Sequence, residues 1–356
     1  MVVIEARGIT KSFEEVVALD RVSLTTHDGE MFTLLGPSGC GKTTFLRCVA
    51  GFEYPEEGSI FFDAVEVTNR PPYKRETGMV FQNYALWPHM TVYDNVAYGL
   101  KVRKVPKGET NARIREVLKM VHLEGMEKRT PHQLSGGQQQ RIALARALVV
   151  NPKVLLFDEP LSNLDAKLRV DMRAEIKRIQ GSLGITTIYV THDQEEAMSI
   201  SDRIAILNEG RLEQLGSPVD IYFRPESSFI ADFIGQGTFL QGQVVSRATY
   251  LRVALDDGEE IEAVPSNPSY EPQPGDKVLI AIRPESFAIG DGGKGNAFRC
   301  EVYHVAFLGK TRRILARRDG QKFVIEADPH SAYREGERIR VRVDPEQTLA
   351  IRAEPS

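Results

Sequence analysis

The chain has 356 residues, enough for about two domains that each bury a core. With 42% hydrophobic and 26% charged residues it has the composition of a globular protein, and its net charge of -4 excludes nucleic-acid binding through a general positive field. No apolar run approaches the ~20 residues that cross a bilayer, and the first residues lack the layout of a secretory signal. The three cysteines form neither a disulfide framework nor a metal-ligand pattern, so we expect a reduced, cytosolic protein.

Residues 1–235 alternate short apolar runs with helical patterns. Helical patterns cover residues 42–49 and 166–183. The apolar runs are typical of buried parallel strands and lie at 32–35, 154–157, 187–190 and 203–207. This alternation predicts a parallel sheet flanked by helices. Residues 86–150 contain no strand-like run, so we expect an inserted helical lobe there.

A phosphate-binding loop is predicted directly after the first of these strands. Residues 36–43 match G-x-x-x-x-G-K-T, a turn in which backbone N–H groups cradle phosphates. Lys42 would neutralise phosphate oxygens and Thr43 would ligate Mg²⁺. We interpret Cys40 as a small filler residue rather than a redox group. The residues expected around the phosphates are Gly36, Pro37, Ser38, Gly39, Cys40, Gly41, Lys42, Thr43 and Thr44.

Polar residues follow three other predicted strands, where α/β sheets bind ligands. Asp158 can hold Mg²⁺ through water, and Glu159 can orient and deprotonate an attacking water. Gln82, after an apolar run at 79–81, can bind Mg²⁺ or that water through its neutral amide. His192 follows the run 188–190 and can donate to a terminal phosphate, although a lone histidine at a strand end is more often structural.

A second glycine pair opens a helical pattern in the segment Leu134-Ser135-Gly136-Gly137-Gln138. Free N–H groups at the start of a helix form an anion site. The chain therefore has two glycine segments that can face phosphate. Its other candidate nucleotide-binding residues, however, suffice for only one nucleotide.

After residue 235 the pattern changes to strand alternation, as at 250–255, 277–282 and 338–343. The dipeptides at 257–258 and 319–320 are typical hairpin turns. We predict a small β-barrel domain over 236–356. Its basic strand carries Arg312, Arg313, Arg317 and Arg318. No aromatic residues are interleaved with these arginines, so we expect a solvated face rather than a nucleic-acid site.

Taken in order, these segments resemble the ATP-binding cassette (ABC) ATPases. Residues 36–43 are similar to the Walker A motif of that family, Gln82 to its Q-loop and 154–159 to its Walker B motif. Residues 134–138 are similar to its signature, 162–165 to its D-loop and His192 to its switch histidine. The stretches 80–100 and 158–180, together with 282–286, resemble importer ATPases of the maltose, polyamine and ferric-iron type, which carry a C-terminal TOBE domain.

The resemblance implies an α/β P-loop NTPase with a RecA-like parallel sheet and an inserted helical lobe, followed by an all-β, OB-like barrel. It implies hydrolysis of ATP with Mg²⁺ in a homodimer, where each ATP lies between the Walker A motif of one chain and the signature of the other. Ser135, Gly136, Gly137 and Gln138 would then face the partner's nucleotide, and Asp165 would contact the facing subunit. Phe13 would stack on adenine; the alternative for Phe13 is a packed strand aromatic.

It further implies an energy-coupling subunit on the inner face of the cell membrane. The chain would drive a separate permease that docks near Gln82–Asn95, with an extracytoplasmic solute-binding protein as an indirect partner. Tyr84, Leu86, Trp87 and Met90 would form the socket, unless they belong to the core of the helical lobe. Residues 235–240 favour polyamine or ferric iron over sugar as the solute. The alternative is a soluble ABC-type ATPase acting on nucleic acid or ribosomes, which a single cassette without heptads disfavours.

Overall fold

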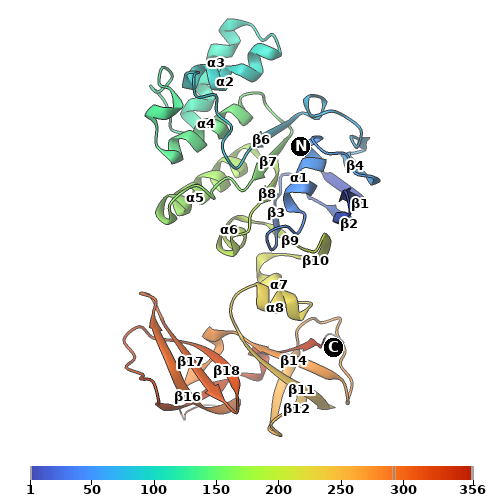
Figure 1. The fold of residues 1–356 in the computed structure, drawn as a ribbon, viewed down its shortest axis with the longest axis vertical. Helices are drawn as coiled ribbons and strands as arrows, with labels where there is room; N and C mark the ends of the chain where they lie inside the picture. The colour runs from blue at the N-terminus through green and yellow to red at the C-terminus, as the bar shows by residue number, and fades with distance from the viewer. Residues whose placement is uncertain (1, 291, 293, 354–356) are drawn as a thin grey trace. The chain divides into compact units, whose positions relative to one another are not determined.

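The computed structural model describes residues 2–290, 292 and 294–353 (Figure 1). The chain forms two compact units, Met1–Pro218 and Val219–Ser356. The short helices α7 (Pro218–Phe223) and α8 (Ser228–Phe233) precede the boundary expected at residue 235, and all but the first residue of α7 fall in the second unit. Within the described ranges, none of the helices combines the length and apolarity that a membrane span requires.

The first unit is built on a six-stranded sheet in the order β10-β9-β3-β8-β7-β6. All neighbouring pairs in it are parallel except β10 with β9. The strands are β3 (Met31–Leu35), β6 (Thr77–Val80), β7 (Val154–Asp158), β8 (Thr186–Val190), β9 (Arg203–Asn208) and β10 (Arg211–Gly216). Every residue of β3, β7 and β8 is buried, as expected for parallel strands covered on both faces. The predicted parallel sheet is confirmed.

Helices cover both faces of this sheet. In β7, Val154 and Leu156 pack into a core that includes α1 (Lys42–Ala50). Leu155 and Phe157 point into the other core, where the covering helices are α2 (Val92–Val102), α3 (Lys107–Met120), α4 (Gly136–Leu148), α5 (Ala166–Leu183) and α6 (Gln194–Ile200). Short 3₁₀ turns lie at η1 (Pro72–Lys74) and η2 (Pro131–Gln133). Figure 1 shows α2, α3 and α4 grouped at one end of the unit, away from β1 and β2.

A four-stranded antiparallel sheet packs against the same core as α1 and is not among the strands predicted from sequence. Its order is β2-β1-β4-β5, formed by β1 (Ile4–Phe13), β2 (Val16–Thr25), β4 (Glu57–Phe62) and β5 (Val65–Glu66). The pairing of β1 with β2 shifts register between Ala6 and Ile9 and again before Ser12. Such bulges break the regular alternation by which strands are found.

The second unit contains a closed five-stranded barrel and an additional five-stranded sheet. The barrel follows the order β11 (Thr238–Arg247), β12 (Leu251–Leu255), β13 (Glu260–Pro265), β20 (Thr348–Arg352) and β14 (Lys277–Ile282). The sheet follows the order β15 (Ala288–Ile289), β19 (Arg338–Val343), β16 (Asn296–Phe307), β17 (Arg312–Arg318) and β18 (Gln321–Ala327). Both contribute to one apolar core, and 3₁₀ turns lie at η3 (Pro284–Ser286) and η4 (Pro345–Gln347). The OB-like barrel is therefore confirmed, and the extra sheet is a finding of the structure.

The basic strand β17 is not simply a solvated face. Arg318 lies 3.1 Å from Asp257 and also pairs with Glu259, and its side chain is only 17% exposed. Arg312 donates from Nε to the carbonyl oxygen of Pro329 at 2.9 Å. Arg313 donates from Nη1 to Gln236 Oε1 at 2.9 Å. Three of the four arginines are thus engaged within the unit, and we withdraw the expectation of a solvated face for them.

Candidate functional site

The loop at 36–43 wraps around the amino group of Lys42. Lys42 Nζ donates to the carbonyl oxygens of Gly36 at 2.8 Å and Pro37 at 2.7 Å, and the residue is 5% exposed. Gly41 has φ 103°, and a Cβ there would lie 2.3 Å from the carbonyl oxygen of Ala18, so only glycine fits. Helix α1 begins at Lys42, which turns its free N–H groups toward the loop. These features fit the binding of an anion by the loop.

Asp158, at the end of β7, meets the start of α1. Thr43 Oγ1 donates to Asp158 Oδ1 at 3.0 Å. Burial raises the pKa of the Asp158 carboxyl, and the hydrogen bond from Thr43 opposes that rise. A hydroxyl and a carboxylate at this distance supply the hard oxygen ligands that Mg²⁺ prefers, so the pair fits a magnesium ion.

Glu159 lies between the two other polar residues expected at this edge of the sheet. Its Oε2 accepts from Gln82 Nε2 at 3.1 Å, and its Oε1 lies 3.2 Å from His192 Nδ1. The backbone of Glu159 has φ 44°, a left-handed conformation that is strained for a residue with a side chain. Strain of this kind persists only where the surroundings enforce it, and the Glu159 side chain is held between Gln82 and His192.

The segment 162–165 links this cluster to α5. Ser162 Oγ donates to the carbonyl oxygen of Glu159 at 3.0 Å, and Asn163 Nδ2 donates to that of Gln82 at 2.9 Å. Asp165 caps α5 by accepting from the Leu168 N–H at 2.9 Å. The resemblance placed Asn163 in the D-loop segment 162–165 but gave it no role of its own, because an asparagine beside a turn is common.

The segment 134–138 forms the capped start of α4. Ser135 Oγ accepts from the Gln138 N–H at 3.4 Å, and Gln138 Oε1 accepts from the Ser135 N–H at 3.0 Å, a reciprocal capping box. A Cβ on Gly137 would lie 2.8 Å from Leu168 Cδ2. Among the described residues, no hydrogen bond joins this segment to the loop at 36–43. The two glycine segments are thus separate features of the chain.

Phe13 lies at the end of β1 and is 44% exposed, so it is not packed into the core as a strand aromatic would be. The Lys11 amino group lies 5.1 Å from the centre of its ring. An exposed ring beside a cation is available for stacking on a planar ligand.

The loop at 81–91, which includes most of the expected docking segment, is held by buried polar groups. Asn95 is fully buried and donates to the carbonyl oxygens of Trp87, Met90 and Thr91, while the Trp87 N–H donates to Asn95 Oδ1. Tyr84 is 7% exposed and belongs to the core of the helical lobe. We therefore correct the expectation that Tyr84 lines a socket, since its side chain is covered by the lobe.

The backbone of this loop is also strained. Tyr84 has φ 57° and the next residue, Ala85, has φ 49°. A left-handed residue with a side chain costs about 1–2 kcal/mol, so the pair requires support from elsewhere. Arg146 on α4 supplies it, donating to the carbonyl oxygens of Tyr84 at 2.7 Å and Ala85 at 2.5 Å. Arg146 was missed in the sequence because arginine in an amphipathic helix usually points to solvent.

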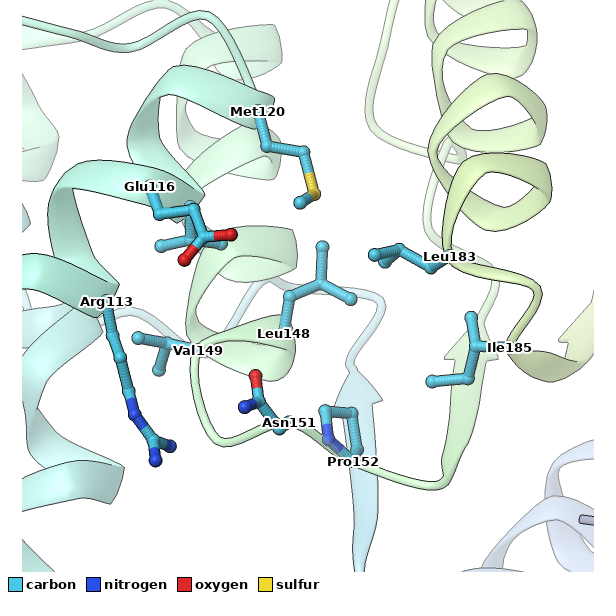
Figure 2. Close-up of a pocket in the computed structure, with 10 residues that line it drawn as sticks. Arg113, Glu116, Met120, Leu148, Val149, Asn151, Pro152, Leu183 and Ile185 are labelled. Carbon is cyan, nitrogen blue, oxygen red and sulfur yellow. The ribbon is translucent and has the colours of Figure 1, made fainter. Parts of the chain in front are cut away.

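A cavity of about 310 Å³ lies at the opposite edge of the sheet (Figure 2). Its wall includes Pro152 and Ile185, which precede β7 and β8, and the side chains of Met120, Leu148 and Leu183, which point toward one another. None of the candidate site residues lines it. The polar cluster is therefore confined to the carboxyl ends of the strands.

Known proteins share both parts of this chain. A family model described as "ABC transporter" matches residues 19–162, and one described as "TOBE domain" matches residues 280–351. A spermidine/putrescine import ATP-binding protein of Rubrobacter xylanophilus is 46% identical over 98% of this chain and 94% of its own length. A Fe(3+) ions import ATP-binding protein of Escherichia coli is 46% identical over 91% of this chain and 90% of its own length. A dimeric structure of a bacterial ABC transporter cassette is 33% identical with a TM-score of 0.55, over 60% of this chain and 98% of that one.

Proposed function

The chain belongs to the ABC transporter family as an importer-type ATPase with a C-terminal TOBE domain, and we propose that it hydrolyses ATP at the cluster of Gln82, Glu159 and His192. The observation that carries this assignment is the position of Glu159 at the carboxyl edge of the sheet. Its backbone is strained, and its carboxylate contacts both Gln82 and His192. A carboxylate in that place can accept the proton of an attacking water.

The neighbouring residues would bind the phosphates and Mg²⁺. Lys42 and the N–H groups of the loop at 36–43 hold and neutralise the phosphates. Thr43, Asp158 and Gln82 would hold Mg²⁺, Asp158 through water. Bound there, the ion would offset the negative charge on the phosphate oxygens.

The contact between His192 Nδ1 and Glu159 limits which proton the imidazole can donate to a phosphate. If Nδ1 donates its proton to Glu159, a neutral imidazole keeps only a lone pair on Nε2. Donation from Nε2 to a phosphate then requires either a second proton on the ring or release of Glu159. His192 can therefore signal an occupied site by exchanging one partner for the other.

We further propose that two copies of the chain form the working enzyme. Each chain has one phosphate loop and one 134–138 segment, which share no hydrogen bond within the described residues. A symmetric dimer would bring Ser135, Gly136 and Gly137 of one copy to the nucleotide held by the other. The dimeric state of the similar cassette supports this arrangement. Asp165 and Phe13 take the roles expected from the sequence, at the facing subunit and at adenine.

The relatives support a proposal for the transported solute and for the membrane partner. Because similar proteins import spermidine/putrescine or Fe(3+) ions, we propose a polyamine or ferric iron as the solute. The permease would dock at the cytoplasmic face of the membrane on the loop at 81–91, where Leu86, Trp87 and Met90 are half-buried. A solute-binding protein outside the cell would be the indirect partner.

Affinity purification of the Glu159→Gln variant with Mg-ATP from solubilised native membranes tests this proposal. The variant is expected to retain ATP and hold the assembly together, so a polytopic permease should co-purify in stoichiometric amount and be identified by mass spectrometry. The same purification without nucleotide is the control and should recover less permease. Ribosomal proteins or nucleic acid without a permease would instead favour a soluble ABC-type ATPase.

A further inference from the structure

The loop at 81–91 is bonded to three separate parts of the first unit. Asn163, next to the catalytic cluster, donates to the carbonyl oxygen of Gln82 at 2.9 Å. Asn95 on α2 holds the far end of the loop at Trp87 and Met90. Arg146 on α4 holds the middle, at Tyr84 and Ala85. The loop is therefore held at Gln82 itself and at two places after it, through which a displacement of Gln82 can pass to α2 and α4.

The Arg146 contact has the geometry of a rigid connection. Its Nη2 and Nη1 atoms donate to two successive carbonyl oxygens, of Tyr84 and Ala85, which the left-handed backbone turns toward α4. A planar guanidinium can bridge two acceptors in this way, whereas a lysine ammonium has no fixed fork. The neighbouring residues Ala145 and Ala147 are 0% and 5% exposed, so this part of α4 is packed on both sides.

The same helix begins at the segment that would face the partner's nucleotide. Ser135 caps α4, and Arg146 lies eleven residues later, about 16 Å along a continuous helix. A helix of this length moves as one body, so a shift at the Arg146 end also moves Ser135 and Gly136. Arg146 thus provides a direct hydrogen-bonded link between the loop next to Gln82 and the helix that begins at the 134–138 segment.

We propose that Arg146 is a positioning residue that couples nucleotide occupancy at Gln82 to the placement of the 134–138 segment, through the loop at 81–91. The proposal rests on the proposed function, since it takes Gln82 to contact the bound nucleotide or its Mg²⁺. It assigns to one residue the communication between the chain's own nucleotide and the site it completes in the partner.

The chain carries its own reporter for this coupling. Trp87 is the only tryptophan in the sequence. The Arg146 guanidinium carbon lies 5.1 Å from the centre of its ring, and the Trp87 and Tyr98 rings lie 4.3 Å apart. Intrinsic fluorescence therefore reports on the loop without a label.

The test compares full-length wild type with Arg146→Met, Arg146→Lys and Arg103→Met. Arg103 is the matched control, because it donates to the Val150 carbonyl oxygen at 2.9 Å in the same lobe but does not contact the loop. Trp87 emission is followed during titration with Mg-AMP-PNP, and nucleotide affinity is measured separately with a fluorescent ADP analogue. The readout is the nucleotide-dependent change in emission, since the baseline itself depends on the cation near the ring.

We expect a saturable change in wild type and in Arg103→Met, and an about tenfold smaller change in Arg146→Met, with nucleotide affinity altered less than about twofold. Arg146→Lys keeps the charge and one donor, preserves folding where methionine does not, and should give an intermediate change. An undiminished change in either Arg146 variant would overturn the coupling, as would a wild type that binds nucleotide without any change in emission. A wild type that binds no nucleotide would instead refute the proposed function.

Discussion

The catalytic edge of the first unit and the motif at 282–286 of the second unit use polar side chains in opposite ways. Arg283 is 5% exposed and donates to the carbonyl oxygens of Ala231 at 2.9 Å and Tyr222 at 3.1 Å. Tyr222 in turn donates its hydroxyl to Glu285 at 2.6 Å. Glu159, in contrast, sits in a strained backbone at an accessible edge and contacts Gln82 and His192, both exposed. A motif whose polar atoms are satisfied inside the fold supports structure, whereas polar side chains held together at an accessible edge fit the site that we propose.

The largest effect should come from Glu159→Gln, which removes the proton acceptor and changes little else. We expect turnover to fall by about 10²- to 10⁴-fold, the usual contribution of a general base, with an unchanged melting temperature. Phosphate release in the presence of Mg-ATP measures the rate. A variant that hydrolyses ATP at the wild-type rate would show that Glu159 is not the general base. The proposed difference in role between Glu159 and Arg283 would then be unsupported.

The substitution Ser135→Arg tests whether the second glycine segment serves another copy of the chain. The bulky charge should abolish cooperative hydrolysis, lowering the Hill coefficient from about 2 to about 1, while ATP binding persists. Ser227→Arg is a matched control, because Ser227 also caps a helix, accepting from the Ile230 N–H at 3.2 Å, in the second unit. Loss of ATP binding in the Ser135 variant would assign the segment to the chain's own site instead.

Replacing Arg283 with methionine should destabilise the second unit and spare the first. The variant leaves the carbonyl oxygens of Tyr222 and Ala231 buried without their donor, a loss of about 3 kcal/mol. Urea unfolding measures this loss, and ATP affinity should not change. Arg317→Met, at an exposed position of β17 where the guanidinium lies 4.5 Å from the centre of the Tyr303 ring, should cost at most about 1 kcal/mol. Equal losses in the two variants would contradict the structural assignment of the motif.

The sequence predicts the motif residues of the proposed site well and the residues that support the structure less well. The pattern of apolar residues predicts strands such as β7 and the helix α5 (Ala166–Leu183). Helix α5 has the bounds predicted for it. The loop at 36–43, Asp158 and Glu159 follow from motifs whose chemistry demands those residue types. Their assigned roles stay predictions, but their close approach at the end of the sheet is observed.

The residues that were missed hold backbone carbonyl oxygens, Arg146 and Arg75 over long sequence separations and Asn95 within the loop before it. Arg146, Asn95 and Arg75 each bind backbone carbonyl oxygens, and Arg75, 1% exposed, reaches those of Cys48 and Val49 at the end of α1. A polar side chain in a helical or loop pattern is normally solvated, so nothing local distinguishes these residues. The antiparallel sheet around β1 was missed for a different reason, because its bulges hide the strand period.

The smallest expected effect concerns Glu196, a buried carboxylate close to the site but outside the catalytic cluster. It is 3% exposed and accepts from the Tyr189 hydroxyl at 3.0 Å and from Thr191 Oγ1 at 2.9 Å. Burial raises the pKa of Glu196, and the hydrogen bonds from Thr191 and Tyr189 oppose that rise; Asp193 adds to the rise and Arg173 opposes it to a smaller extent. Because the folded state then binds the proton more tightly than the unfolded state, the contribution of Glu196 to stability is greatest below its ordinary pKa and is lost as the pH rises through the folded value.

Glu196→Gln should therefore stabilise the protein at pH 7, because the amide oxygen still accepts from both hydroxyls and carries no charge to bury. We expect a gain of about 1 kcal/mol at pH 7 that shrinks toward zero as the pH falls below 4.5, the ordinary pKa of this group. Urea unfolding across this range measures the difference. Glu195→Gln is the control, because its side chain is 86% exposed and should show no such pH dependence. A glutamine variant less stable than wild type at pH 7 would mean that the charge of Glu196 is needed, and Glu196 would then belong with the site rather than with the supporting structure.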